Sequence, residues 1–327
     1  MKLFPLHLVP NNTACNFMRI RHITVGLMAL LFIVSISAIS IKGFNLALDF
    51  TGGTLIEARF EHPADIDLVR QRLNENGYPN VQVQNFGSGT DVLVRLQLPD
   101  VQSKGAANVD PGQTEREVSH IVTLMGDTHN PAKLMRNEFV GPQAGKELTR
   151  NGIYASLFVI VGFLIYISFR FEWKFAVVAS ITTLFDVFIT AGFFSLSGRE
   201  FDLNVLAGLL AVMGFSINDT IVVFDRVREN FRNMRVESLE IMNRSINQTL
   251  SRTIITSLVF FLSVLALYLY GGGSLQGLAV TQMIGTITGT LSSIFLACPL
   301  LTLGKLRVSK RDLMPKSKDL ELLNKRP

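Results

Sequence analysis

Six long apolar runs constrain the fold of this chain more than any other feature. Each is about 18–25 residues long with few or no charges, which suits a hydrocarbon core of about 30 Å. The runs are Ile23–Ile41, Gly152–Phe169, Phe175–Leu196, Leu203–Phe224, Thr253–Tyr270 and Leu278–Leu303. The sequence therefore predicts an α-helical polytopic membrane protein with six transmembrane helices.

The composition agrees with this class. Charged residues make up 17% of the 327 residues, whereas soluble domains carry about 25%. The formal net charge of +5 comes mainly from short stretches beside the apolar runs. We interpret it as a topology signal and expect membrane lipid, not nucleic acid, as a partner. The first run follows basic residues as in a signal peptide, but its length favours an uncleaved anchor. Cys15 and Cys298 are too far apart to indicate a disulfide framework.

The flanking basic residues predict the orientation. One side carries Lys2, Arg19, Arg21, Arg170, Lys174, the arginines between Asp225 and Arg252, and the basic tail; Arg199 alone lies in a short loop on the other side. Both termini should therefore be cytoplasmic. The expected segments are a cytoplasmic N-terminus (1–22), a first span (23–41), a domain on the opposite side of the membrane (42–150), a five-helix bundle (151–304) with a cytoplasmic amphipathic connector (226–252), and a basic cytoplasmic tail (305–327).

The long polar stretch predicts a folded α+β domain. Expected strands are Thr54–Phe60, Val81–Asn85, Asp91–Leu98 and Lys133–Val140, expected helices are Pro63–Asn76 and Gln113–Met125, and a turn (87–90) and a polar loop (Ser103–Gly112) connect them. The order β-α-β-β-α-β is typical of a ferredoxin-like domain.

Two shorter patterns concern helix surfaces. Arg226–Arg235 places Val227, Phe231 and Met234 on one face, which favours an amphipathic helix on the inner membrane surface, with a solvated connector as the alternative. In the last run, Gly285 and Gly289 form a GxxxG step, for which we expect a packing role.

Two carboxylates lie inside apolar runs. Asp186 shares one helical face with Thr182 and Thr190, and this stripe, together with Asn218 of the fourth run, predicts a secondary polar seam between helices. Asp219 lies beside Asn218. An ionised carboxylate at a helix centre costs at least about 2.5 kcal/mol, so such residues face the bundle interior and are functional by default. A purely structural role for either carboxylate is the alternative.

Asp219 has a candidate partner in Arg252. Counting along the fourth and fifth runs places the two at similar depths, roughly 24 Å and 27 Å from the far surface. A carboxylate whose proton affinity depends on a movable arginine can act as a proton relay. The alternative is a static ion pair that holds two helices together.

No nucleophile–base constellation, metal-ligand spacing or phosphate loop is present, so we expect no enzyme activity, no cofactor and no metal. After the first run comes a glycine-pair segment, Asp49-Phe50-Thr51-Gly52-Gly53-Thr54. Paired glycines indicate a tight turn or a close backbone approach before a strand.

Four ordered motifs carry a family resemblance. They are the segment Asp49–Thr54 (DFTGGT), the segment Val140–Leu148, the fourth-run segment Gly214–Asn230 (GFSINDTIVVFDRVREN) and the segment Ser251–Ser257. In these motifs, and in its six-span layout over about residues 17–310, the chain resembles the SecF members of the SecD/SecF family, which is related to the resistance-nodulation-division transporters.

The resemblance implies a function. Members of this kind pair with SecD, join the SecYEG channel and YajC, and use the proton motive force to help draw translocating polypeptides out on the periplasmic side. On this sequence, Asp219 is then the proton-responsive carboxylate and Arg252 its switching partner, whereas the resemblance assigns no role to Asp186. Two rivals stay open: a homodimeric exporter of small molecules or lipids, and a structural scaffold. Sodium stays open as the coupling ion.

Overall fold

The computed structural model describes residues 14–78, 81–86, 89–96, 111–127, 129–309 and 312. The chain divides into two compact units, one formed by residues up to Asn45 and from Ser156 onward, the other by Leu46–Ala155. The predicted turn at 87–88, the loop residues 103–110 and most of the basic tail lie outside the described residues.

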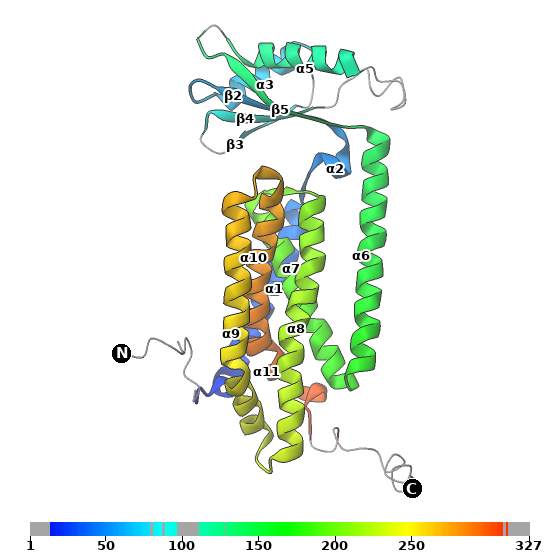
Figure 1. Ribbon diagram of the computed structural model, residues 1–327, viewed down its shortest axis with the longest axis vertical. Helices are drawn as coiled ribbons and strands as arrows, with labels where there is room; N and C mark the ends of the chain where they lie inside the picture. Colours follow the sequence, from blue (N-terminus) through cyan, green and yellow to red (C-terminus); the bar gives the residue numbers. More distant parts are fainter. Residues whose placement is uncertain are drawn as a thin grey trace, which may run out of the picture. The chain divides into compact units, whose positions relative to one another are not determined.

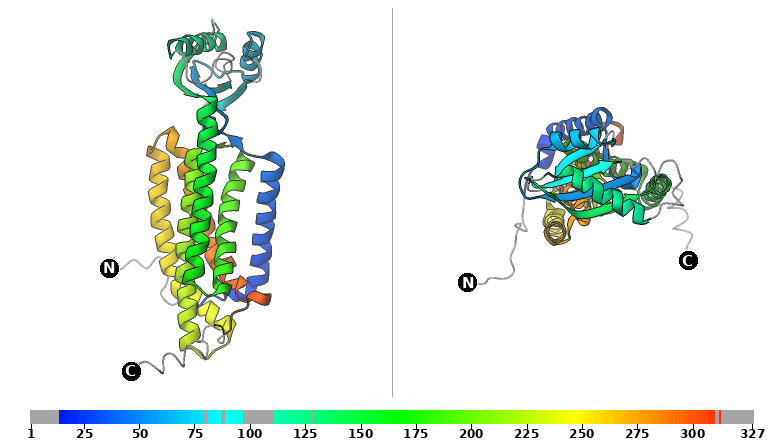
Figure 2. Two further views of the ribbon diagram at one scale, coloured as in Figure 1. Left: turned by 90° about the vertical axis from the view of Figure 1, so that its right-hand side faces the viewer. Right: turned by 90° about the horizontal axis from the view of Figure 1, so that it is seen from above.

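The first unit is a helical bundle. Among the described residues, six helices are long and apolar enough to cross a membrane, with mean hydropathies from 1.5 to 2.4, which confirms the predicted number of spans. They are α1 (Arg21–Lys42), α6 (Pro142–Arg170), α7 (Trp173–Ser197), α8 (Leu203–Asn233), α9 (Ser238–Tyr270) and α10 (Gly273–Ser292), the last continued by the π-helical segment η3 (Ser293–Ala297) and by α11 (Cys298–Leu300). Figure 1 labels these helices, and Figure 2 shows α9 in yellow beside α10 in orange.

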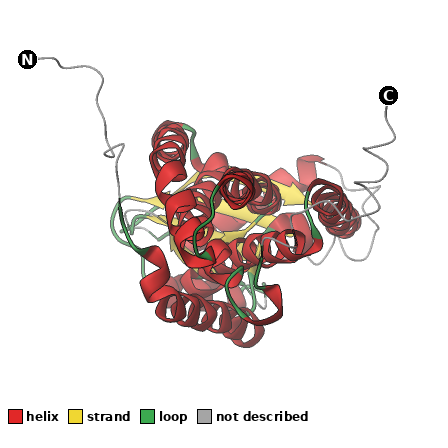
Figure 3. Ribbon diagram, turned by 90° about the horizontal axis from the view of Figure 1, so that it is seen from below, coloured by secondary structure: helices red, strands yellow, loops and turns green. Residues whose placement is uncertain are grey.

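Small residues let α10 pack closely on α8. A Cβ atom at Gly285 would lie 2.1 Å from Val212 Cγ2, and one at Gly289 would lie 3.4 Å from Ser216 Cα. Gly277 meets Val205 in the same way further along the two helices. The GxxxG step therefore has the expected packing role. Figure 3 shows the helices in red, seen along their axes from below.

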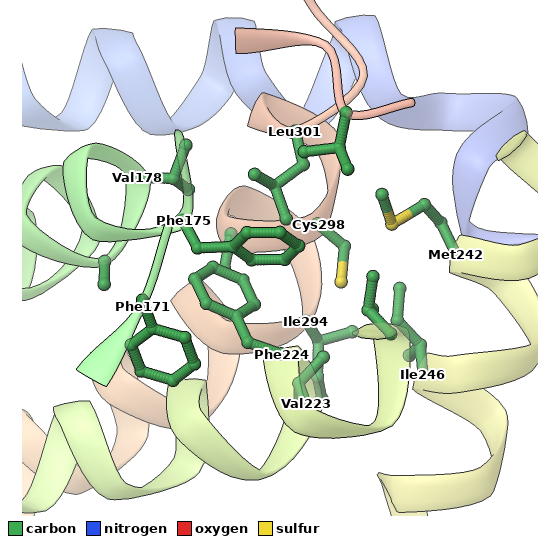
Figure 4. Packing of buried hydrophobic residues seen from close by; sticks show 14 of the residues in the cluster. Phe171, Phe175, Val178, Val223, Phe224, Met242, Ile246, Ile294, Cys298 and Leu301 are labelled. Carbon is green, nitrogen blue, oxygen red and sulfur yellow. The ribbon is translucent and has the colours of Figure 1, made fainter. Parts of the chain in front are cut away.

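At one end of the bundle, buried side chains from several helices pack into one hydrophobic cluster (Figure 4). Phe175 from α7 and Phe224 from α8 meet edge to face, with ring centroids 5.2 Å apart. Val227 and Phe231, also from α8, are buried in the same cluster with Met242 of α9. Such a core is held by close packing, because lipid tails are as apolar as these side chains.

This packing corrects the expectation for residues 226–252. The stretch does not form a separate surface helix: α8 continues to Asn233, and α9 begins at Ser238. The apolar face with Val227 and Phe231 packs against α9 instead of lying on the membrane surface, because α9 offers it a closely fitting partner.

The second unit is an α+β domain. Its antiparallel sheet has the order β3-β4-β2-β5, with β2 (Gly53–Phe60), β3 (Gln82–Phe86), β4 (Asp91–Leu96) and β5 (Ala132–Val140). Helices α3 (Ile66–Glu75) and α5 (Pro111–Met125) bury one face of the sheet. The predicted β-α-β-β-α-β order is confirmed. The first helix begins three residues later than predicted, because the Asp65 side chain caps the backbone N–H groups of Asp67 and Leu68.

Candidate functional site

Asp186 is fully buried at the middle of α7. Its Oδ2 atom accepts a hydrogen bond from the Ser216 hydroxyl of α8 and another, of 2.8 Å, from Ser292 at the end of α10. Among the residues that the structure describes, its Oδ1 atom has no hydrogen-bond partner. Gly289 lies against this junction, since a Cβ there would be in ordinary contact with Ser216 at 3.4 Å and with Asp186 Oδ2 at 3.7 Å. Asp186 therefore ties three helices together at one point.

Fewer side chains than the predicted stripe contains form hydrogen bonds between helices. Thr182 and Thr190 are fully buried as expected, but their hydroxyls donate to backbone carbonyls of their own helix. Hydroxyls in apolar surroundings take this local acceptor when no closer partner faces them. Of these three side chains, Asp186 is the one that hydrogen-bonds to neighbouring helices in the described part of the chain.

Asp219 forms a second junction one helical turn further along α8. Its side chain is 3% exposed, and its Oδ2 atom accepts a hydrogen bond of 3.3 Å from Ser257 of α9. Ser257 in turn accepts a hydrogen bond of 2.7 Å from Thr290 of α10. Two hydroxyl groups therefore connect this carboxylate to α9 and α10.

The structure does not bring Asn218 or Arg252 to Asp219. Asn218 is exposed, and in the described part of the chain Arg252 is exposed and makes no ion pair with Asp219. Ser257, which does contact Asp219, lies five residues beyond Arg252, or about 7.5 Å along a helix. The depth count assumed that the far ends of α8 and α9 lie level. The switching role of Arg252 stays a prediction.

The sequence did not predict which hydroxyl groups donate hydrogen bonds to the two carboxylates. Serine and threonine are common along these spans, and only the helix packing selects Ser216, Ser257, Thr290 and Ser292. One signal was available: Ser216 precedes Asp219 by three residues, so both point into the bundle from one face of α8.

The glycine-pair segment is a structural joint. Residues Leu48–Thr51 form the short helix α2, and Gly52 and Gly53 follow with φ angles of 67° and 122° before β2 begins. Those angles suit glycine alone. At the start of α6, Gly145 lies so near that a Cβ there would be 3.0 Å from Gly52 N, and Thr149 donates to Phe50 O. The paired glycines thus permit both the turn and the close backbone approach.

Charged groups gather at the end of α8. A cleft of about 400 Å³ is lined by Arg170, Asp225, Arg228, Glu229, Arg232 and Asn233. Arg228 bonds Glu172 at 2.9 Å, and Arg170 bonds Asp225 at 2.5 Å. Exposed ion pairs of this kind contribute little to stability singly. The cleft is separate from the junctions at Asp186 and Asp219.

Membrane-length helices that bury carboxylates in their midst, joined to an α+β unit, define a polytopic membrane protein of the kind found among ion-driven transporters. Comparison with known families gives matches to two models of one family. The model of "Protein export membrane protein SecD/SecF, C-terminal" matches residues 120–307, and that of the SecD/SecF GG motif matches residues 37–64. The chain belongs to the SecD/SecF family.

Its relatives narrow this further. The chain is 42% identical to protein translocase subunit SecF of Pseudomonas aeruginosa over 303 residues, 92% of this chain and 94% of that protein. It is also 42% identical to the SecF subunit of Vibrio alginolyticus over 302 residues, 92% of each chain. These relatives support a role in protein translocation.

Solved structures agree. SecDF of Thermus thermophilus, a translocon-associated membrane protein, superposes with a TM-score of 0.78 at 35% identity, over 91% of this chain and 39% of that one. A SecDF structure in a "super-membrane-facing form" gives a TM-score of 0.63 at 34% identity, over 98% of this chain and 41% of that one. The chain thus spans about two fifths of the SecDF chains it matches, which supports a SecD partner for it.

Proposed function

We propose that the chain is the SecF-type half of a proton-driven complex that assists Sec-dependent protein export across the bacterial inner membrane. In this proposal it pairs with SecD and joins SecYEG and YajC. The complex uses the proton motive force to help draw translocating polypeptides out on the periplasmic side. The chain's own contribution is conformational work, not covalent catalysis.

Asp219 carries the proposal. It is a nearly fully buried carboxylate within a span, and hydroxyl groups link it to two neighbouring helices. Its ionised form costs free energy in a low-dielectric bundle, and protonation removes that cost. Each protonation state favours the helix arrangement that suits its charge, so a proton gradient can drive α8, α9 and α10 between two arrangements.

Arg252 has a defined place in this scheme. It lies on α9 about one and a half turns before Ser257, the residue that contacts Asp219 here. In the second arrangement, ionised Asp219 attracts Arg252, and protonation releases it. The arrangement described here, in which Ser257 contacts Asp219, is the released one in this proposal.

The test is Asp219→Asn, which keeps the side-chain shape and fixes a neutral group. Export into membrane vesicles is measured with and without a proton gradient, at matched levels of the complex with SecD. We expect normal assembly and no gradient stimulation. The matched control is Asn218→Ala, which removes the exposed neighbouring side chain and should leave stimulation intact.

Two outcomes contradict the proposal. Normal gradient stimulation in Asp219→Asn excludes Asp219 as the proton-responsive group. Loss of SecD association before any loss of stimulation per complex indicates a static packing role. A purified complex that contains two copies of this chain and no SecD favours the homodimeric exporter.

The proposed orientation can be tested with thiol labelling. Cys15 is exposed and, in this proposal, cytoplasmic, whereas Arg70 on α3 is exposed and periplasmic. In cells with a permeabilised outer membrane, an impermeant thiol reagent should label Arg70→Cys and spare Cys15. Labelling of Cys15 under those conditions would reverse the topology.

A further inference from the structure

Ser292 makes two polar contacts beside Asp186 but has only one hydroxyl proton to donate. Ser292 Oγ lies 2.8 Å from Asp186 Oδ2 and 3.1 Å from the backbone oxygen of Gly289, and both atoms are acceptors when Asp186 is ionised. A hydroxyl group has one proton to donate. With Asp186 ionised, the two acceptors must share that proton; each contact has a proton of its own when Asp186 is protonated, donates to Ser292 Oγ, and leaves the serine proton for Gly289 O.

The same count applies at Asp219. Three contacts follow one another: Asp219 Oδ2 to Ser257 Oγ at 3.3 Å, Ser257 Oγ to Thr290 Oγ1 at 2.7 Å, and Thr290 Oγ1 to Thr286 O at 2.7 Å. The two hydroxyl groups supply two protons. A proton on Asp219 supplies the third and makes the whole chain of contacts hydrogen-bonded.

Both series of contacts, from Asp186 and from Asp219, end on α10 at the backbone oxygens of Gly289 and Thr286. These oxygens lie within the last two turns before the π-helical segment Ser293–Ala297. A π segment interrupts regular α-helical bonding and is often found at functional sites. The protonation state of either carboxylate therefore changes hydrogen bonding at the same place on α10.

We propose that Asp186, held between Ser216 and Ser292, is a second proton-accepting group that is coupled to Asp219 through α10. On binding, a proton forms an O–H bond on the Asp186 carboxylate and is donated to Ser292 Oγ. The Ser292 hydroxyl stops donating to Asp186 and donates to Gly289 O. The idea rests on the proposed function, in that Asp219 is taken to be the first such group.

The surroundings of Asp186 supply no counter-charge. Of the helices packed against it, α8 contributes Asp219 near this level, α10 and η3 contain no ionisable residue, and the charged residues of α1 lie at its ends. The unpartnered Oδ1 atom also lacks any donor among the described residues. Burying an ionised carboxylate without a nearby cation costs free energy, and protonation of Asp186 removes that cost.

The experiment is infrared difference spectroscopy of the full chain, in complex with SecD and in lipid vesicles, as pH is changed. A protonated carboxyl group has a carbonyl stretch that its ionised form lacks. We expect Asp186→Asn to remove one such pH-dependent band and Asp219→Asn to remove a different one. Ser292→Ala should shift the Asp186 band, because it removes the hydroxyl that contacts this carboxylate, and should lower gradient-stimulated export.

Ser293→Ala is the matched control, because this buried serine donates at 2.9 Å to the backbone oxygen of Thr290 and to no carboxylate. It should leave both bands and export unchanged. If Asp186→Asn removes no carboxyl band that the wild type shows, the proposal is overturned. Equal behaviour of Ser292→Ala and Ser293→Ala overturns it as well. If Asp219→Asn keeps normal stimulation while the Asp186 band still titrates, the proposed role of Asp219 fails and the second site stands.

Discussion

The contact between α8 and α10 at Gly285 leads to a sharp prediction about Gly285→Ala. The added methyl group would lie 2.1 Å, 2.7 Å and 3.0 Å from the Cγ2, Cγ1 and Cβ atoms of Val212, which is fully buried. Ordinary carbon contacts are about 3.5–4.0 Å, so the nearest pair must separate by about 1.4 Å. Rotating the valine side chain cannot relieve the contact with Cβ, and valine has one strongly preferred rotamer in a helix.

The cost follows from overpacking, which is about 1–3 kcal/mol for an extra methyl in a closely packed core. Gly285→Ala should lower the stability of the purified chain in detergent by that amount, measured as the shift in a denaturant titration. Gly214→Ala is the matched control on α8, because a Cβ there meets no atom within 4 Å. It should be neutral or slightly stabilising, since alanine favours the helix by up to about 1 kcal/mol.

A double variant tests the mechanism. Val212→Ala removes the two methyl groups at 2.1 Å and 2.7 Å and leaves the contact at 3.0 Å. Gly285→Ala combined with Val212→Ala should therefore cost less than the sum of the single changes, by at least about 0.5 kcal/mol. Equal stability of Gly285→Ala and Gly214→Ala, or simple additivity in the double variant, would refute the packing argument.

Two further predictions concern the α+β unit. Gly52→Ala and Gly53→Ala should each destabilise it by about 1–3 kcal/mol, because Gly52 has φ of 67° with ψ of 172° and Gly53 has φ of 122°, backbone conformations that a residue with a Cβ rarely adopts. Amide hydrogen exchange in β2 measures both, and wild-type protection in either variant would contradict this. The hydrogen bond from Arg72, with backbone hydrogen bonds from His129 and Asn130, lowers the pKa of Asp127 from 3.8 to about 2. The ionised carboxylate therefore stabilises the folded unit fully at pH values above 3.8, and this stabilisation is lost as pH falls through about 2. Asp127→Asn should therefore weaken amide protection at pH 7, and its difference from the wild type should vanish at the acid end; a difference independent of pH would exclude this linkage.

Much of the fold could be predicted because its signals are local. The apolar runs set the number of spans, since a helix that satisfies its own backbone is the simplest way to cross a bilayer. The alternation of apolar residues likewise predicted the strands of the second unit, and Asp65 shows how a single cap moved a helix start by three residues. The extent of α8 and α9 was underestimated, because Val227 and Phe231 are apolar for packing against α9 and not for contact with lipid.

The sequence by itself determined that Asp186 and Asp219 are buried inside a bundle, because a carboxylate within an apolar span has nowhere else to go. It did not determine their partners. Asn218 is adjacent to Asp219 in the chain but is exposed, whereas Ser257, 38 residues away, donates to its carboxylate. Which side chains meet depends on how far each helix is rotated and shifted against the next, and glycines such as Gly285, which lies close against Val212, help to set this packing. Only the tertiary structure could therefore reveal that hydroxyl groups join both carboxylates to α10.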